Sequence, residues 1–171
     1  MKHGLLLILM FVSLNVFSQT PADKTQIVTV IQTMEKSYNE HDYSFSGKYD
    51  ILSKDAFLIN PVGMYWKNRA EIIQALQVLG NLRLKYESVK YTIKVLRFLG
   101  PGAALVVVYA DGRVEQNYNF PDGSKGGVKG DKTYGMYSFT LTKIGETWKI
   151  NSIHITHIDP VAAQLNPLKN Q

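Results

Sequence analysis

The sequence predicts an α+β fold in which three helices pack on one face of a curved, mostly antiparallel sheet of about six strands. Two observations support this class. Near the N-terminus apolar residues recur every three or four positions, the period of a helix, whereas from residue 84 the period is two, as in a strand. The 171-residue chain shows no internal repeat and no interdomain linker. We therefore expect one domain over residues 20–159 and a short tail over residues 160–171.

The first 18 residues have the features of a secretory signal peptide. Lys2 precedes an apolar stretch over residues 5–17, and Ser18 supplies a small residue at the cleavage point. A retained membrane anchor is the weaker alternative, because 13 apolar residues are fewer than the roughly 20 that span a bilayer. We expect cleavage after Ser18, export to the periplasm or the medium, and no membrane contact thereafter.

A first helix is expected to begin at a capping box. Thr20 stands three residues before Asp23, with Pro21 at the first helical position, so the Thr and Asp side chains can each accept a backbone N–H. An apolar stripe follows at steps of four, three, four and three residues, and it comprises Ile27, Ile31, Met34, Tyr38 and His41. The stripe predicts a helix of about four turns that packs against the core.

Two further helices are expected before the long strands. Asp42 can cap a short helix over residues 43–52. Asn68 and Glu71 repeat the capping-box pattern ahead of another apolar stripe, and Gly80 is the expected end of that third helix.

Six strands are expected from alternation and from turn residues. Two are short, over residues 55–60 and 64–66, and four are long, over residues 84–99, 103–110, 133–143 and 147–158. The strand over residues 103–110 is apolar on both faces, so we expect it to lie centrally or to be half covered by a partner subunit. Residues 120–131 carry four glycines and are expected to form an exposed loop.

Composition excludes several classes of function. The net charge is +5, but the basic residues are scattered and do not alternate with aromatic residues, so nucleic-acid binding is not expected. The absence of cysteine excludes disulfides, thiol nucleophiles and iron–sulfur clusters. His154 and His157 point to opposite faces of a strand and cannot share a metal ion. The glycine-rich segment over residues 123–133 lacks a phosphate-loop ending, and we expect no cofactor.

Four segments in this order resemble the SnoaL-like members of the nuclear transport factor 2-like superfamily, including those described as SgcJ/EcaC-like. The resemblance extends from about residue 25 to residue 159, and its landmarks are His41-Asp42, residues 55–63, residues 68–73 and residues 148–156. It implies a cone-shaped barrel with a pocket at the wide end, and commonly a dimer formed through the sheet. Lys67-Asn68 replaces the glycine usual before the third helix, and residues 120–131 form a longer loop than is typical.

His154 is the first candidate for chemistry. Strict alternation places His154 on one face of the last strand with Ser152 and Thr156, bounded by Trp148 and Ile150. A neutral imidazole inside an apolar cone can act as a general base on a carbon next to a carbonyl group. The structural alternative, which we weight more heavily, is a hydrogen-bonded core histidine.

Tyr137 and Tyr109 are candidate donors to a developing enolate oxygen, or else core aromatic residues. Asp42 is near the helix tips that, by the resemblance, overlook the pocket, although an N-cap role is the stronger interpretation. The predicted pocket residues are Asp42, Tyr109, Tyr137, Ser152, His154 and Thr156, of which His154 and Tyr137 are the predicted catalytic pair.

Three functions remain open at this point. We rank first an exported, dimeric pocket protein that binds a small apolar or aromatic molecule. The second is an isomerase, cyclase or dehydratase that uses a histidine base on an enolisable carbonyl compound. The third is an interaction module without a pocket, which is favoured if large side chains fill the cone. The superfamily contains both enzymes and non-catalytic proteins, so the resemblance does not decide among them.

Overall fold

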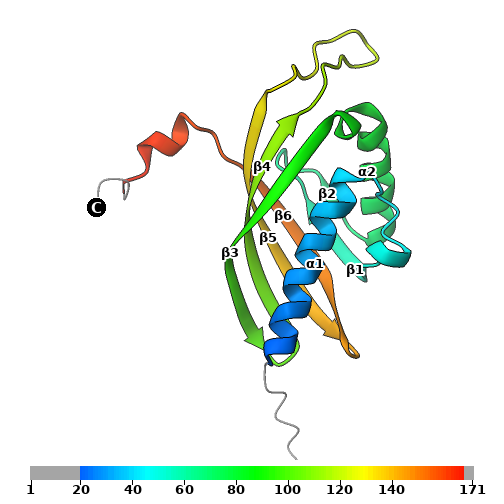
Figure 1. Ribbon diagram of the computed structural model, residues 1–171, viewed down its shortest axis with the longest axis vertical. Helices are drawn as coiled ribbons and strands as arrows, with labels where there is room; N and C mark the ends of the chain where they lie inside the picture. Colours follow the sequence, from blue (N-terminus) through cyan, green and yellow to red (C-terminus); the bar gives the residue numbers. More distant parts are fainter. Residues whose placement is uncertain (1–19, 168–171) are drawn as a thin grey trace, which may run out of the picture.

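A computed structural model describes residues 20–167 of the chain. It has an α+β fold with two helices and one six-stranded sheet (Figure 1). The elements are α1 (Pro21–Asn39), β1 (Leu52–Ile59), β2 (Tyr65–Trp66), α2 (Arg69–Leu82), β3 (Glu87–Gly100), β4 (Ala103–Val114), β5 (Lys132–Ile144) and β6 (Thr147–His157). The predicted signal peptide and its cleavage after Ser18 lie outside the described residues.

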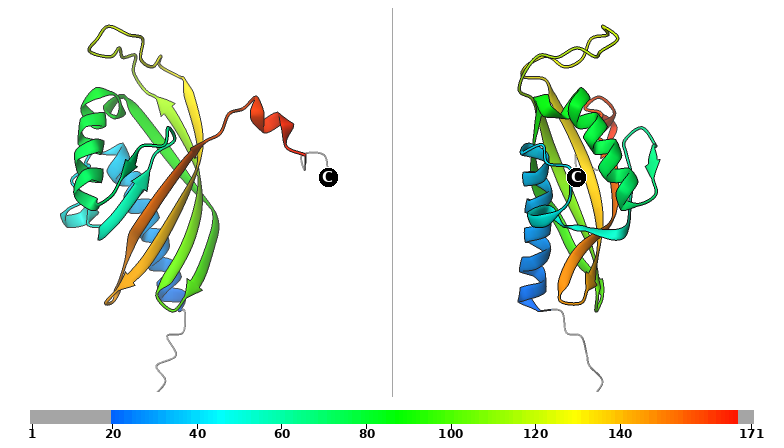
Figure 2. Two further views of the ribbon diagram at one scale, coloured as in Figure 1. Left: turned by 180° about the vertical axis from the view of Figure 1, so that it is seen from behind. Right: turned by 90° about the vertical axis from the view of Figure 1, so that its right-hand side faces the viewer.

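The six strands are ordered β2-β1-β6-β5-β4-β3. All neighbours pair antiparallel except β1 and β6, which run parallel with Leu58 opposite Ile153. The expected number of strands is therefore confirmed, and the sheet is mixed. β2 and β3 are open edges, so the expected cone-shaped barrel does not close. The sheet is instead curved and open, with both helices on its inner face (Figure 2).

The first helix begins where the sequence predicts. The Thr20 hydroxyl accepts the Asp23 N–H at 3.1 Å, and the Asp23 carboxylate accepts the Thr20 N–H at 3.0 Å. Asp23 also accepts a hydrogen bond from Trp148 Nε1 at 2.9 Å and forms an ion pair with Lys143 at 3.0 Å. One carboxylate thus caps α1 and fastens it to β5 and β6.

The expected second helix over residues 43–52 is wrong. The Asp42 carboxylate accepts the N–H of Ser44 at 3.0 Å, which closes a local turn instead of capping a helix. Phe45 then adopts a left-handed backbone conformation, with φ of 46°. Tyr43 and Phe45 are buried in the core, and only a single 3₁₀ turn forms, over Gly47–Tyr49. Side-chain burial here outweighs the helix signal.

The remaining helix is α2, and its start is confirmed by the Asn68 side chain, which accepts the Glu71 N–H at 3.0 Å. Its expected end at Gly80 is wrong, because the helix continues to Leu82. Gly80 is buried inside the helix against Tyr43, and a Cβ atom there would lie 2.7 Å from the tyrosine Cε2. The glycine therefore allows close packing and does not terminate the helix.

A β-bulge in β6 changes which side chains face the helices. Thr140 pairs with Ser152 and Leu141 with Ile150, so Asn151 is an extra residue on β6. Ile150 is buried under the helices before the bulge and Ile153 after it, although three residues separate them. From Asn151 onward, the residues expected inside face outward, and those expected outside face inward.

Beyond the sheet, two segments stand apart from the core. The expected exposed loop is confirmed, although it begins at residue 115, and it extends past the ends of β4 and β5. The tail leaves β6 on the side away from the helices and carries a short 3₁₀ turn over Ala162–Leu165 (Figure 1). Over residues 20–167, no helix has the length and apolar character needed to cross a membrane.

Candidate functional site

The structure places His154 on the outer face of the sheet, where its side chain is exposed. Its pairing partners are Ser138 on β5 and Ile59 on β1. Ser152 and Thr156 share that outer face, and the Ser152 hydroxyl hydrogen-bonds to Thr140. The expectation that these three residues line the inside with Ile150 is wrong because of the bulge at Asn151. That His154 acts as a general base stays a prediction. The prediction assumed an apolar environment, and the exposed outer face of the sheet does not provide one.

The two candidate tyrosines lie on opposite faces of the sheet. Tyr137 faces inward and packs edge-on against Tyr91, with ring centroids 5.5 Å apart. Tyr109 faces outward, where it stacks on Tyr134 at 6.0 Å and lies under the Lys94 ammonium. Of the predicted pocket residues, Tyr137 is the one on the inner face of the sheet. The predicted catalytic pair of His154 and Tyr137 is therefore separated by the sheet.

The interior under the helices is almost filled. A cavity of about 40 Å³ remains, lined by Tyr38, Tyr43, Phe45, Tyr91, Tyr137 and Ile155 among others. That volume holds about one water molecule. Burial raises the pKa of Tyr43 to about 12 and raises the pKa of Tyr137, so both phenols are neutral hydrogen-bonding groups at neutral pH. The cavity as it stands is too small for an organic ligand.

Glu87 is the centre of a polar cluster at the wide end of the curved sheet, which sequence reasoning missed. Its carboxylate accepts the hydroxyls of Tyr38 and Tyr118, each at 3.1 Å, and lies 3.6 Å from the Arg83 guanidinium. Only 15% of the side chain is exposed. Tyr118 belongs to the long loop, and its ring stacks on Tyr86 at 5.2 Å. The cluster thus anchors the loop to the start of β3.

A groove of about 600 Å³ lies beside this cluster, between the β1–β2 turn and α2. Its walls are mainly apolar and are formed by Val62, Met64, Trp66, Ala75, Val78 and Leu79. Val62 and Val78 are 74% and 54% exposed, which is unusual for neighbouring apolar side chains on a folded surface. The polar side chains that line the groove are Asn60, Glu71, Gln74, Arg83 and His157. Because of the bulge in β6, His157 and not His154 lies on the inner face of the sheet.

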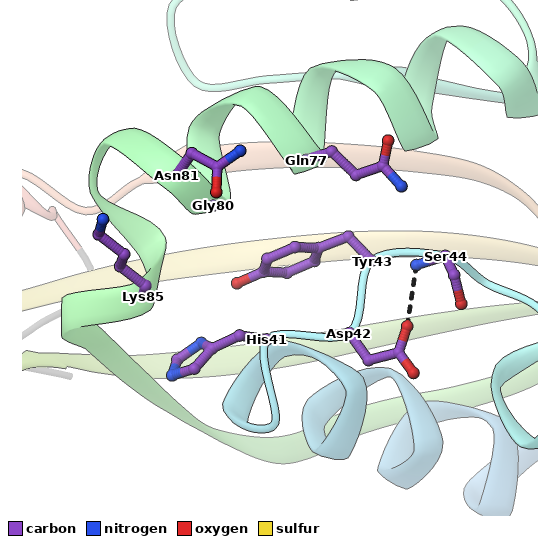
Figure 3. A pocket seen from close by; sticks show the side chains of 8 residues that line it. All are labelled: His41, Asp42, Tyr43, Ser44, Gln77, Gly80, Asn81 and Lys85. Atoms are coloured by element: carbon purple, nitrogen blue, oxygen red, sulfur yellow. Dashed lines mark hydrogen bonds between the residues drawn. The ribbon is translucent and has the colours of Figure 1, made fainter.

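Asp42 lines a different groove, of about 490 Å³, between the segment after α1 and the C-terminal half of α2 (Figure 3). Hydrogen bonds from Ser44 hold the pKa of the Asp42 carboxyl below its usual value, so the group is an ionised acceptor and a poor base. Asp42 therefore lines a groove that contains none of the other predicted pocket residues. It belongs to a turn and does not cap a helix. Over residues 20–167, no cluster of three or more histidine or acidic residues could hold a metal ion.

Comparisons with known proteins identify the fold. No family model and no curated protein matches the sequence. An uncharacterised Caulobacter vibrioides protein with a cystatin-like fold superimposes with a TM-score of 0.72 at 24% identity, over 84% of this chain and 95% of that one.

Two further solved structures are similar in fold. A ketosteroid isomerase-like protein from Erwinia carotovora atroseptica gives a TM-score of 0.63 at 13% identity, over 82% and all of the respective chains. A nuclear transport factor 2-like superfamily protein from Salmonella enterica serovar Typhimurium gives 0.61 at 16% identity, over 80% and 91%. The chain has the fold of the cystatin-like and nuclear transport factor 2-like proteins, which confirms the resemblance at the level of fold.

Proposed function

We propose that this protein is an exported, dimeric protein that binds a small apolar or aromatic molecule in the groove between the β1–β2 turn and α2. The observation that carries the proposal is the groove itself. Its volume of about 600 Å³ lies in the range of small-molecule sites, and exposed apolar side chains line it beside one guanidinium, one imidazole, one carboxylate and two carboxamides.

The position of Arg83 favours a ligand with an acidic or polar end. An apolar body can lie along Val62, Met64 and Val78, while its polar end reaches Arg83 and His157. Arg83 is already 3.6 Å from Glu87, so a ligand acid would share the guanidinium with that carboxylate. This arrangement favours a weakly acidic or neutral polar end over a multiply charged one.

The filled interior argues against a ligand deep in the cone. Large aromatic side chains leave about 40 Å³ there, the condition that favours an interaction module without a pocket. The groove lies outside that interior and is open to solvent, so it does not depend on the cone. We therefore place ligand binding at the groove.

Export rests on the sequence of residues 1–18, and dimerisation on the outer face of the sheet. That face presents Leu105, Val107, Tyr109 and Met136 from adjacent strands, without a helix over them. A broad, partly apolar sheet face is commonly covered by a second copy. Light scattering should give twice the monomer mass, and Val107→Asp should give the monomer. A wild-type monomer at micromolar concentration would remove this part of the proposal.

The groove is tested with anilinonaphthalene sulfonate, an aromatic probe with one anionic group. Fluorescence titration should give saturable binding at one site. Val78→Asp should weaken binding by about tenfold or more, because it places a carboxylate against an apolar, anionic ligand. Val128→Asp is the matched control, since Val128 is 41% exposed on the distant loop. Equal affinities of the two variants would refute binding in the groove.

An enzyme of the isomerase or dehydratase type is the second candidate. It is favoured by the presence of His157 and Tyr137 around one small cavity at the wide end, next to Glu87. In that case His157, in place of His154, is the group available as base, and Tyr137 is the donor. Turnover of an enolisable carbonyl compound that is lost in His157→Gln and kept in His154→Gln would establish this alternative.

A further inference from the structure

We propose that the polar groove between residues 41–44 and the C-terminal half of α2 is a second binding site, and that it takes a neutral polyhydroxylated ligand such as a sugar unit. The groove has a volume of about 490 Å³. Its side chains come from two elements that face one another across the space in Figure 3. His41, Asp42, Gln77, Asn81 and Lys85 line it, and Tyr43 lies between them.

The backbone of residues 41–44 is fixed in place. The N–H of Asp42 donates to the Ser37 carbonyl at 3.0 Å, and the Ser37 hydroxyl donates to the Asp42 carbonyl. The N–H of His41 donates to the Tyr38 carbonyl at 3.1 Å, while His41 itself has a left-handed φ of 57°. The backbone that carries the side chains of this wall is therefore ordered before any ligand arrives, which lowers the entropy cost of binding.

The opposite wall is held just as closely. Gly80 brings α2 against the Tyr43 ring, so the helix cannot approach further and the width of the groove is set. Tyr43 is 5% exposed and also lines the small interior cavity, so its ring separates the polar groove from the apolar core. The groove is a defined space with a fixed floor.

The polar side chains of this fixed groove have few partners within the protein. Among residues 20–167, no hydrogen bond or ion pair engages the side chains of His41, Gln77 or Asn81, and the Lys85 ammonium only lies over the Tyr86 ring at 5.0 Å. Asp42 uses Oδ1 for the Ser44 N–H, which leaves Oδ2 available. Unpaired groups are usual on a solvated surface, but here they line one groove between two ordered backbone segments.

The mixture of groups selects the class of ligand. Asp42 and Lys85 supply one negative and one positive charge, so an ion of either sign gains little net attraction. Two carboxamides and an imidazole offer donors and acceptors side by side, which matches hydroxyl groups, since each hydroxyl both donates and accepts. A ligand with several neighbouring hydroxyls satisfies the set, whereas an apolar molecule would leave it unpaired.

This site is separate from the apolar groove of the proposed function. Gln77 and Asn81 line this groove, whereas Gln74 and Val78, on the adjacent strip of α2, line the other, and the two grooves have no lining residue in common. The two sites can therefore be occupied at once, and each can fail its test without the other.

The test is an NMR titration of the ¹⁵N-labelled chain with glucose, galactose, mannose and inositol, each to about 50 mM, a level that fills a millimolar site. Glycine and inorganic phosphate are titrated in parallel as charged probes. We expect at least one polyol to give saturable shifts in residues 41–44 and in the side-chain amides of Gln77 and Asn81. We expect no displacement of anilinonaphthalene sulfonate.

Matched variants on one helix locate the site. Gln77→Ala should weaken polyol binding about tenfold, as expected for one lost hydrogen bond of about 1.4 kcal/mol. Gln74→Ala, the same change one turn earlier on α2 and in the other groove, should leave the affinity within about twofold. Three results would each overturn the proposal: no saturable polyol shifts at these residues, tighter binding of glycine or phosphate, or equal affinities of the two variants.

Discussion

Replacing Gly80 with alanine tests the packing of α2 on Tyr43, because two opposing effects can be weighed. Alanine is favoured over glycine inside a helix by about 1 kcal/mol. The added Cβ would lie 2.7 Å from Cε2 and 3.0 Å from Cδ2 of the Tyr43 ring. That ring is buried and packs edge-on against Tyr38 with centroids 6.1 Å apart, so it cannot simply rotate away. Overpacking of this kind costs about 1–3 kcal/mol.

The clash should therefore prevail, and Gly80→Ala should lower the free energy of unfolding by about 1 kcal/mol and the melting temperature by about 2–4 °C. Tyr43→Val removes the ring, so in that background the same Gly80→Ala change should instead raise the stability by about 1 kcal/mol. Urea denaturation of the four proteins completes the cycle. A stabilising effect of Gly80→Ala in the wild-type chain would refute the packing argument.

Three shorter predictions follow from the other contacts. His154→Gln should leave the melting temperature and probe binding unchanged, since the side chain is exposed on the outer face; a large loss of stability would contradict this placement. The hydrogen bonds from Trp148 and Thr20 hold the pKa of the Asp23 carboxyl well below its usual value. Its stabilisation is therefore full above about pH 4 and decreases as the pH falls toward the folded pKa, so the difference between the urea curves of wild type and Asp23→Asn should stay constant from about pH 7 to pH 5 and decrease below about pH 4. Tyr118→Phe removes the hydroxyl that donates to Glu87 at 3.1 Å but keeps the ring, so hydrogen exchange in residues 115–131 should accelerate while exchange in β6 does not.

The sequence predicted the elements with strong local signals. The capping box at Thr20 and the N-cap at Asn68 both lie where expected, since a cap depends on residues within one helical turn. The short strands before α2 and the four long strands also form at nearly the predicted residues. Alternation and capping are local properties, and a single sequence is enough to detect them.

The candidate site depended on information that is not local. One extra residue in β6, Asn151, exchanges the faces of His154 and His157, and nothing in the sequence around it departs from regular alternation. Asp42 carries a helix-cap signal, yet the burial of Phe45 in the core decides the local conformation. The Glu87 cluster joins side chains from four segments of the chain, so no motif could indicate it.

The parallel pairing of β1 with β6 has a consequence for the order of folding. Leu58 gains its neighbour in the sheet only when Ile153 is in place. The Asp23 carboxylate likewise needs Trp148, which is 125 residues away in the sequence, for its hydrogen bond. Contacts so distant along the chain are slow to form, because the intervening loop must first be closed. While the ribosome is still producing the middle of the chain, the apolar faces of α1 and β1 have no partner. The N-terminal half can therefore complete its part of the sheet only after the last strand is present.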